Sequence, residues 1–326
     1  METMNLPLFL DSGAHGLYTE HVIKKHHEGD VADEKMSLRV KTSKSLRERG
    51  FDWYTTKEFW DYVDKYAEFL HSDRAKHIEV YANVDVIFNP KLTWDVQRYM
   101  EKEHGLHPLP VIHYGTPLRW LERYVDHGYE YIALGGLGQE ATKSKYLSWA
   151  DGAFRVICNQ PSFLPKCKVH GFAISSHQLI VSYPWYSVDS SKWVKQAGFG
   201  YILMPPWDGQ RKCWDYRNSF LTIRVSGRSG KSGLAMAMEH TVQRGLRKLF
   251  DRYMEEKGYK LGKSEITVVD GKETEQVIED GICNNVTQRS AMNLLYFIDL
   301  SNSLPKWPWP FALSKNRAHT FNMPLE

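Results

Sequence analysis

Cysteine is scarce in this sequence, and no two cysteines have the spacing of a metal-binding pair. The four cysteines are Cys158, Cys167, Cys213 and Cys283, and none of them forms a C-x-x-C motif. A cysteine-rich zinc site is therefore not expected. Because secretory features are missing, we expect reduced thiols. A disulfide between Cys158 and Cys167 stays the alternative.

Long apolar segments are also missing. The sequence has no run of about 18 apolar residues, the length that a membrane-spanning helix needs. The N-terminus does not resemble a signal peptide, because its first apolar segment ends at the charge of Asp11. We therefore expect no membrane contact and a cytoplasmic location. Internal repeats and low-complexity tracts are absent as well.

Aromatic side chains, in contrast, are abundant. They make up 13% of the 326 residues and include 11 Trp and 18 Tyr, more than a core alone needs. We expect some of them to line a groove or to stack on nucleobases. The formal net charge of +3 is compatible with a polyanionic partner without requiring one.

Short apolar segments alternate with amphipathic ones. Thr55 and Glu58 form a capping-box pattern, and Phe59, Val63 and Tyr66 follow at helical spacing. Further helices are expected at 92–103 and from Pro117 to Gly128. Strands are expected at 6–10, 77–85, 109–115, 129–136, 168–175, 183–190 and 200–205, with another candidate at 220–226. This alternation is typical of parallel β/α units. It favours an α/β fold of the (β/α)8 TIM-barrel type, with irregularities, over a doubly wound open sheet.

The character of the chain changes near residue 230. We expect residues 1–230 to form the barrel, with a charged surface insertion at 20–50. Residues 231–326 are expected to form a mainly helical extension packed on the barrel. Its elements would be a long helix at 232–257, a polar hairpin at 259–280 and a helix at 286–298.

Lone carboxylates stand at the ends of three predicted strands. Asp11 ends the first, Asp85 the second and Asp189 the sixth, and a glycine-rich segment at 134–138 ends the fourth. An aspartate at a strand end is often only a helix cap or a turn former. In a barrel, however, strand ends meet at one face and carry the catalytic groups. Two carboxylates there suit displacement at a sugar carbon, one as nucleophile and one handling a proton.

Four motifs in order resemble the tRNA-guanine transglycosylases over residues 5–205. "LFLDSGAHG" resembles that family's "TDSGGFQ" segment, and "ALGGLGQE" resembles its "GGLAVGE" loop. "VHGFAIS" and "YSVDSS" resemble the strand before the nucleophile and the segment that holds it. The likeness is greatest to the phage and bacterial branch that exchanges guanine in DNA for a 7-deazaguanine such as preQ0.

The resemblance implies roles for individual residues. Asp189 would attack C1′ of the nucleotide as the nucleophile, and Asp11 would act as general acid and base. His113 stands where the family has a glutamine, and the family's Cys/His zinc motif is missing. The residues implied to contact the base and its nucleotide are Asp85, His113, Gly135, Gly136, Leu137, Phe172, Ser12 and Gly13.

The implied activity is that of a pentosyltransferase that needs no metal, ATP or redox cofactor. A free 7-deazaguanine would be the co-substrate and DNA the macromolecular partner, and a homo-oligomer stays open. If a phage encodes the chain, the location would be the host cytoplasm. "SGRSGKSG" at 226–233 resembles a phosphate loop, but Val225 stands where that pattern needs its first glycine.

A basic segment is the candidate DNA track. Residues 224–260 hold nine Lys and Arg against four acidic residues. An ordinary solvated helix face is the alternative interpretation. Basic residues at 35–49 are a second candidate. The residues chosen for DNA contact are Arg228, Lys231, Arg244, Arg247 and Lys248.

Three other functions remain open at this stage. The same chemistry could act on RNA, as in a tRNA-guanine transglycosylase. A non-catalytic barrel could bind nucleic acid or a protein partner. An unrelated barrel glycosidase could also use two carboxylates, although the glycine-rich loop and the aromatic content disfavour it.

Overall fold

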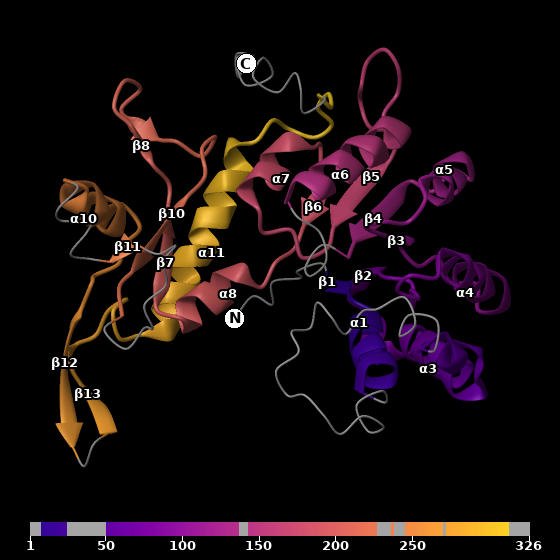
Figure 1. Cartoon of the computed structure of the whole chain (residues 1–326), viewed down its shortest axis with the longest axis horizontal. Helices are drawn as coiled ribbons and strands as arrows, with labels where there is room; N and C mark the ends of the chain where they lie inside the picture. The colour runs from indigo at the N-terminus through magenta and orange to yellow at the C-terminus, as the bar shows by residue number, and fades with distance from the viewer. Residues whose placement is uncertain are drawn as a thin grey trace. The chain divides into compact units, whose positions relative to one another are not determined.

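The structure is a computed structural model that describes residues 8–24, 50–136, 143–226, 236–237, 245–269 and 272–312. It divides into two compact units (Figure 1). The described residues up to Ala173, Pro184–Val188 and the segment from Pro308 form the first unit. Ile174–Tyr183 and the described residues of Asp189–Trp307 form the second. The domain boundary expected at residue 230 lies outside the described residues and stays a prediction.

The first unit is built on parallel strands that follow one another in sequence order. The strands are β1 (Leu8–Leu10), β2 (Ile78–Tyr81), β3 (Val111–His113), β4 (Tyr131–Gly135), β5 (Lys168–Gly171) and β6 (Ser187–Val188). β1 pairs with β2, and β3, β4, β5 and β6 form one sheet. A parallel bridge between Ala82 and Leu109 links the two sets. Each of these strands was expected from the apolar segments, so the mixed α/β class is confirmed.

Helices join successive strands, as parallel pairing requires. They are α1 (Ala14–Leu17), η1 (Tyr18–Lys24), η2 (Gly50–Thr55), α3 (Lys57–His71), η3 (Asp73–Ala75), α4 (Pro90–Glu103), α5 (Arg119–Asp126) and α6 (Lys143–Ile157). The expected capping box is wrong by one residue. Thr56, not Thr55, caps α3 by accepting from Phe59 N at 3.4 Å. Glu58 instead accepts a hydrogen bond from the Trp53 indole at 3.1 Å.

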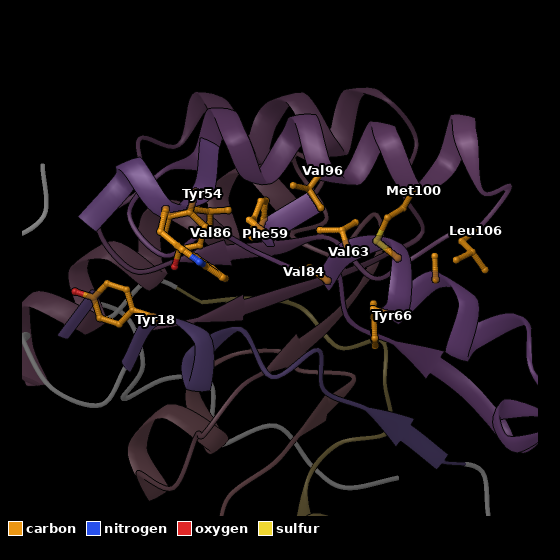
Figure 2. Close-up of a cluster of buried hydrophobic side chains, with 12 residues drawn as sticks. Tyr18, Tyr54, Phe59, Val63, Tyr66, Val84, Val86, Val96, Met100 and Leu106 are labelled. Atoms are coloured by element: carbon orange, nitrogen blue, oxygen red, sulfur yellow. The ribbon is translucent and has the colours of Figure 1, made fainter. Parts of the chain in front are cut away.

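A buried cluster fixes α3 and α4 against the segment after β2 (Figure 2). Phe59 and Val63 of α3 are fully buried, as are Val84 and Val86 of that segment. Burial of such side chains stabilises a fold by about 1.5–3 kcal/mol each. The helical spacing on α3 therefore identified its core face correctly. The same packing holds the segment 82–86, which carries Asp85.

The parallel strands of the first unit curve strongly. Phe9 of β1 stacks on His170 of β5 with 4.5 Å between ring centroids. On a flat sheet, strands four positions apart would be roughly 19 Å apart, because neighbouring strands are about 4.8 Å apart. Only a sheet that curls toward closure brings these two side chains into contact. The curvature is compatible with the expected barrel, whose closure stays a prediction.

The second unit departs from the expected continuation of the barrel. β7 (Tyr201–Met204) pairs with β10 (Leu221–Arg224) in the antiparallel direction, and β10 is parallel to β11 (Met236–Ala237). A strand therefore forms within the expected segment 220–226, but it runs antiparallel to β7 and does not extend a parallel sheet. The helix expected over 232–257 is wrong in its first part. β11 lies there, and α10 (Arg247–Glu256) begins only at Arg247.

The remaining elements of the second unit follow the sequence more closely. The expected hairpin is formed by β12 (Lys263–Val269) and β13 (Lys272–Glu279), and the expected last helix is α11 (Val286–Ser303). Shorter elements are α7 (His177–Ser182), α8 (Lys192–Gly198), β8 (Trp207–Asp208) and β9 (Cys213–Trp214). Asn293 of α11 binds β7, since its side chain accepts from Leu203 N at 2.8 Å.

All four cysteines lie among the described residues and are free, as expected. No helix in the described ranges combines the length and the apolar character that crossing a membrane requires.

Candidate active site

Most of the site residues expected in the first unit lie at the carboxyl ends of its strands. Asp11 follows β1, His113 ends β3, Gly135 ends β4, and Phe172 follows β5. Because these strands are parallel, their carboxyl ends share one edge. Asp85 lies four residues beyond the end of β2. It joins the residues at this edge because its side chain contacts His113.

Asp85 and His113 form a close, buried pair. Asp85 Oδ2 lies 2.8 Å from His113 Nε2, and the two side chains are only 8% and 11% exposed. The pKa of the Tyr54 hydroxyl is raised first by burial and then by the negative charge of Asp85. Tyr54 therefore stays protonated beside the pair at ordinary pH.

The backbone that carries Asp85 is held between two strands. Ala82 N donates to Leu10 O at 2.9 Å, and Asn83 N donates to Leu109 O at 3.0 Å. The Thr93 hydroxyl of α4 accepts from Val86 N at 2.9 Å. Three anchors within five residues leave Asp85 little freedom to turn away from His113.

Gly136, directly after β4, makes room for His113. Gly136 has φ +80°, a left-handed conformation that favours glycine. A Cβ at Gly136 would lie 3.1 Å from Tyr114 N and 3.3 Å from His113 Cβ. A Cβ at Gly135 would lie 3.6 Å from Phe172 Cβ and 3.7 Å from His113 Cδ2. A Cβ would therefore crowd His113 at Gly136, but at Gly135 it would meet only ordinary van der Waals contacts.

Phe172 belongs to a three-ring aromatic group. Its ring meets Phe9 edge-on at 5.7 Å and His170 edge-on at 4.6 Å, while Phe9 and His170 stack. His170 is buried, and its Nδ1 lies 2.7 Å from the Ser187 hydroxyl. Phe9 is 38% exposed, so this group presents an open aromatic edge. Such an edge is suited to stacking on a flat heterocycle.

Asp11, Ser12 and Gly13 form a tight turn after β1. Gly13 has φ +75°, and its N–H donates to Asp11 Oδ1 at 3.4 Å. The Tyr62 hydroxyl of α3 donates to Ser12 O at 2.7 Å. Asp11 therefore stabilises this turn, which is a role that an aspartate at the end of a strand often has. Asp11 is also exposed. Ser12 is buried, and its hydroxyl has no hydrogen-bond partner among the described residues.

The negative charges of Asp11 and Asp85 both raise the pKa of one tyrosine hydroxyl, that of Tyr66. Burial raises the pKa of Tyr66, and the charges of Asp11 and, more weakly, Asp85 raise it further. Burial and Asp11 also raise the pKa of Tyr62. The two carboxylates differ in environment, since Asp11 is exposed and Asp85 is buried.

Asp189 belongs to the second unit. In the sequence it directly follows Val188, the last residue of β6, and precedes α8. The Ser190 hydroxyl accepts from Lys192 N at 3.0 Å, which fixes the turn after Asp189. Lys192 Nζ lies over the Phe220 ring, and burial lowers the pKa of Lys192. The position of Asp189 relative to Asp11 stays a prediction.

Several expected residues fall outside the described ranges. Leu137 of the base site is one of them, and Arg228, Lys231 and Arg244 of the DNA track are the others. Arg247 and Lys248 lie at the start of α10. Arg247 Nε pairs with Asp251 at 2.8 Å within the same helix, which favours the solvated-face interpretation for this residue. The basic residues at 35–49 also lie outside the described ranges.

Sequence reasoning missed the supporting side chains. The Tyr62 hydroxyl donates to the turn at Ser12 O. The charges of both carboxylates raise the pKa of Tyr66. The His170 ring belongs to the aromatic group and stacks on Phe9. The spacing of Tyr62 and Tyr66 on α3 places them on neighbouring turns of the helix. Nothing in that spacing shows which strand end they meet.

Within the described ranges, no group of three or more His, Cys, Asp or Glu side chains is arranged to hold a metal ion. The expectation of metal-free chemistry stays a prediction. Comparison with protein-family models, curated proteins and solved structures found no match to this chain.

Proposed function

We propose that the chain is a DNA-guanine transglycosylase, which exchanges guanine in DNA for a free 7-deazaguanine such as preQ0. The observation that carries this proposal is the cluster of Asp85, His113, Gly136 and Phe172 at one edge of parallel strands. A buried acid–imidazole pair beside an open aromatic edge suits a flat, hydrogen-bonding base.

The proposed reaction has two steps at C1′ of a flipped nucleotide. Flipping is needed because C1′ is not accessible to a nucleophile inside the stack. In the first step the Asp189 carboxylate forms a bond to C1′, and the bond from C1′ to guanine N9 breaks. Asp11 supplies a proton to the departing guanine. In the second step N9 of the incoming base loses its proton to Asp11 and attacks C1′, which releases Asp189.

The environment of Asp11 supports its part in this scheme. The residue is exposed at the strand edge and therefore reachable by a substrate. Its turn is fixed by the Tyr62 hydroxyl and by the left-handed Gly13. A carboxylate held on a rigid turn is better oriented for proton transfer than one on a free loop.

One observation favours a second candidate, a barrel that binds nucleic acid without catalysis. Asp11 accepts a hydrogen bond in its own turn, so a structural role accounts for this carboxylate without any catalytic one. The RNA-directed transglycosylase differs from the main proposal only in its substrate.

The test is mass spectrometry of nucleosides from duplex DNA incubated with the chain and preQ0. We expect preQ0-modified deoxynucleoside with the unaltered chain and none with Asp189→Asn or Asp11→Asn. A parallel incubation with tRNA distinguishes the RNA alternative. Denaturing electrophoresis would detect a covalent DNA adduct. If neither nucleic acid is modified and no adduct forms, the non-catalytic candidate replaces the proposal.

A further inference from the structure

Lys192 is a half-buried cation of the second unit that lies against an aromatic ring. Its Nζ is 4.5 Å from the centroid of the Phe220 ring, a distance at which a cation–π interaction stabilises the protonated amine. Burial lowers the pKa of Lys192, and no carboxylate among the described residues offsets this effect. An ammonium group that has lost part of its water without gaining a counter-ion is suited to binding an anion.

The helix that carries Lys192 is fixed in place by α11 (Figure 1). Lys192 is the first residue of α8. Asn293 Nδ2 of α11 donates to Trp193 O at 3.1 Å. Arg289 Nε of α11 donates to Ala197 O at 2.8 Å. Both ends of α8 are therefore bonded to the same long helix, and the ammonium extends from a rigid element.

The ring in contact with the ammonium is fixed as well. Phe220 meets Tyr296 of α11 edge-on, with 5.4 Å between ring centroids. The loop before Phe220 is organised by the buried Asp215, which accepts from Arg217 N at 2.9 Å and from Asn218 Nδ2 at 2.6 Å. The ring and the helix are thus held by separate contacts. They set the position of the ammonium before any ligand binds, which lowers the entropic cost of binding.

Lys192 also lies close in the chain to the carboxylate proposed as the nucleophile. Asp189 is three residues earlier, and the turn between them is fixed because Ser190 Oγ accepts from Lys192 N at 3.0 Å. In a nucleic-acid strand each sugar carries a phosphate on either side. A nucleophile that reaches C1′ therefore has a phosphodiester anion nearby.

We infer that Lys192 binds a backbone phosphate of the strand whose sugar reaches Asp189. The inference rests on the proposed function and adds to it a residue that holds the substrate. The ligand class is a phosphodiester of DNA, and Lys192 takes no part in making or breaking bonds. Arg247 of the expected DNA track differs from Lys192, because it already pairs with Asp251 in its own helix.

The test measures DNA binding without catalysis, by fluorescence anisotropy of a labelled duplex at pH 7 and several NaCl concentrations. The full chain carries Asp189→Asn throughout, so that no covalent adduct forms. A lysine that neutralises one phosphate contributes about 0.9 to the slope of the logarithm of affinity against the logarithm of salt concentration. We expect Lys192→Gln to lower the slope by about that amount and Lys192→Arg to keep it. Lys192→Met replaces Lys192→Gln if the latter does not fold by circular dichroism.

Lys168 provides a matched control. Its Nζ lies 4.5 Å from the centroid of the Tyr186 ring, the same distance as in the pair of Lys192 and Phe220. Lys168 is the first residue of β5 and so lies at the amino end of that strand, away from the edge of the candidate site. Lys168→Gln should leave the slope unchanged.

An unchanged slope in Lys192→Gln, or an equal fall in Lys168→Gln, overturns the inference. Absence of duplex binding by the chain with Lys192 intact also overturns it. A fall specific to Lys192→Gln, without base exchange in DNA or tRNA by the unaltered chain, would retain the phosphate contact and reject the proposed function. Base exchange by the unaltered chain together with an unchanged slope would reject the role of Lys192 alone.

Discussion

Phe9 of β1 stacks on His170 of β5, with ring planes inclined by 26°. Below this stack, His170 Nδ1 lies 2.7 Å from the Ser187 hydroxyl of β6, and Ser187 lies 2.6 Å from the Tyr131 hydroxyl of β4. One serine therefore links side chains of three adjacent strands. This polar network supports the ring on which Phe9 and Phe172 rest.

Ser187→Ala should destabilise the chain more than an ordinary serine substitution. It leaves the His170 ring nitrogen and the Tyr131 hydroxyl without their shared partner, which costs about 1–3 kcal/mol for a buried group. Ser72→Ala is the control, because Ser72 only bonds Phe69 O at a helix end. Urea denaturation measures the difference. Equal free energies of unfolding for the two variants would contradict the network.

Gly136→Ala should destabilise the chain by more than backbone strain alone. Gly136 and Gly105 both have left-handed φ angles, +80° and +64°. A Cβ at Gly105 meets nothing within 4 Å, whereas one at Gly136 meets Tyr114 N at 3.1 Å and His113 Cβ at 3.3 Å.

The expected cost is about 1–2 kcal/mol for Gly105→Ala, from strain. Gly136→Ala adds the displacement of His113, so it should also weaken guanine binding. Thermal unfolding measures the stability, and quenching of tryptophan fluorescence by added guanine measures the binding. Similar stability and similar guanine affinity in both variants would show that Gly136 does not hold His113 in place.

The two buried cysteines should resist alkylation and confer a pH dependence on stability. Burial raises the pKa of Cys167 from 9.0 to about 11 and that of Cys158 from 9.0 to about 12. At pH 8 we expect iodoacetamide to label the exposed Cys213 first, as measured by peptide mass spectrometry.

The sign of the pH effect follows from these raised values. Above pH 9 the unfolded chain loses its thiol protons before the folded chain does. The stability that the two thiols contribute is therefore complete below pH 9 and declines as the pH rises toward 11–12. Replacing both with alanine should flatten this part of the curve. Rapid labelling of Cys158 in the folded chain would contradict their burial.

The sequence predicted strands better than it predicted their pairing. Apolar segments such as 109–115 and 168–175 became β3 and β5, because a strand buried on both faces needs a short apolar run. The segment at 220–226 has the same pattern but pairs antiparallel to β7. The spacing of apolar residues reflects which side chains are buried. It does not indicate whether a strand runs parallel or antiparallel to its neighbour. The error at 232–257 has a related cause, since helical spacing of apolar residues also fits a short strand followed by a later helix.

For the candidate site, sequence reasoning identified the residues at strand ends but not their partners. The contact between Asp85 and His113 joins residues 28 positions apart in the chain and depends on how the segment after β2 packs. The hydrogen bond from Tyr62 to Ser12 joins residues 50 positions apart. Spacing along one helix or strand cannot reveal such pairs. They require the register of the sheet and the position of α3.

The last prediction concerns that hydrogen bond between Tyr62 and the turn of Asp11. Tyr62→Phe removes the donor to Ser12 O but keeps the ring, so the turn loses an anchor without leaving a cavity. We expect a loss of about 0.5–1.5 kcal/mol in unfolding free energy. We also expect slower base exchange, because Asp11 is no longer held in one orientation.

Tyr99→Phe is the matched control, since its hydroxyl bonds Asp64 at 2.8 Å, outside the candidate site. Both variants lose one tyrosine hydroxyl bond, so their stabilities should be comparable. Only Tyr62→Phe should slow guanine release and 7-deazaguanine incorporation, measured as two half-reactions on labelled DNA. If both variants exchange bases at the same rate, the turn does not orient Asp11 for proton transfer, and its hydrogen bond to Gly13 N would be purely structural.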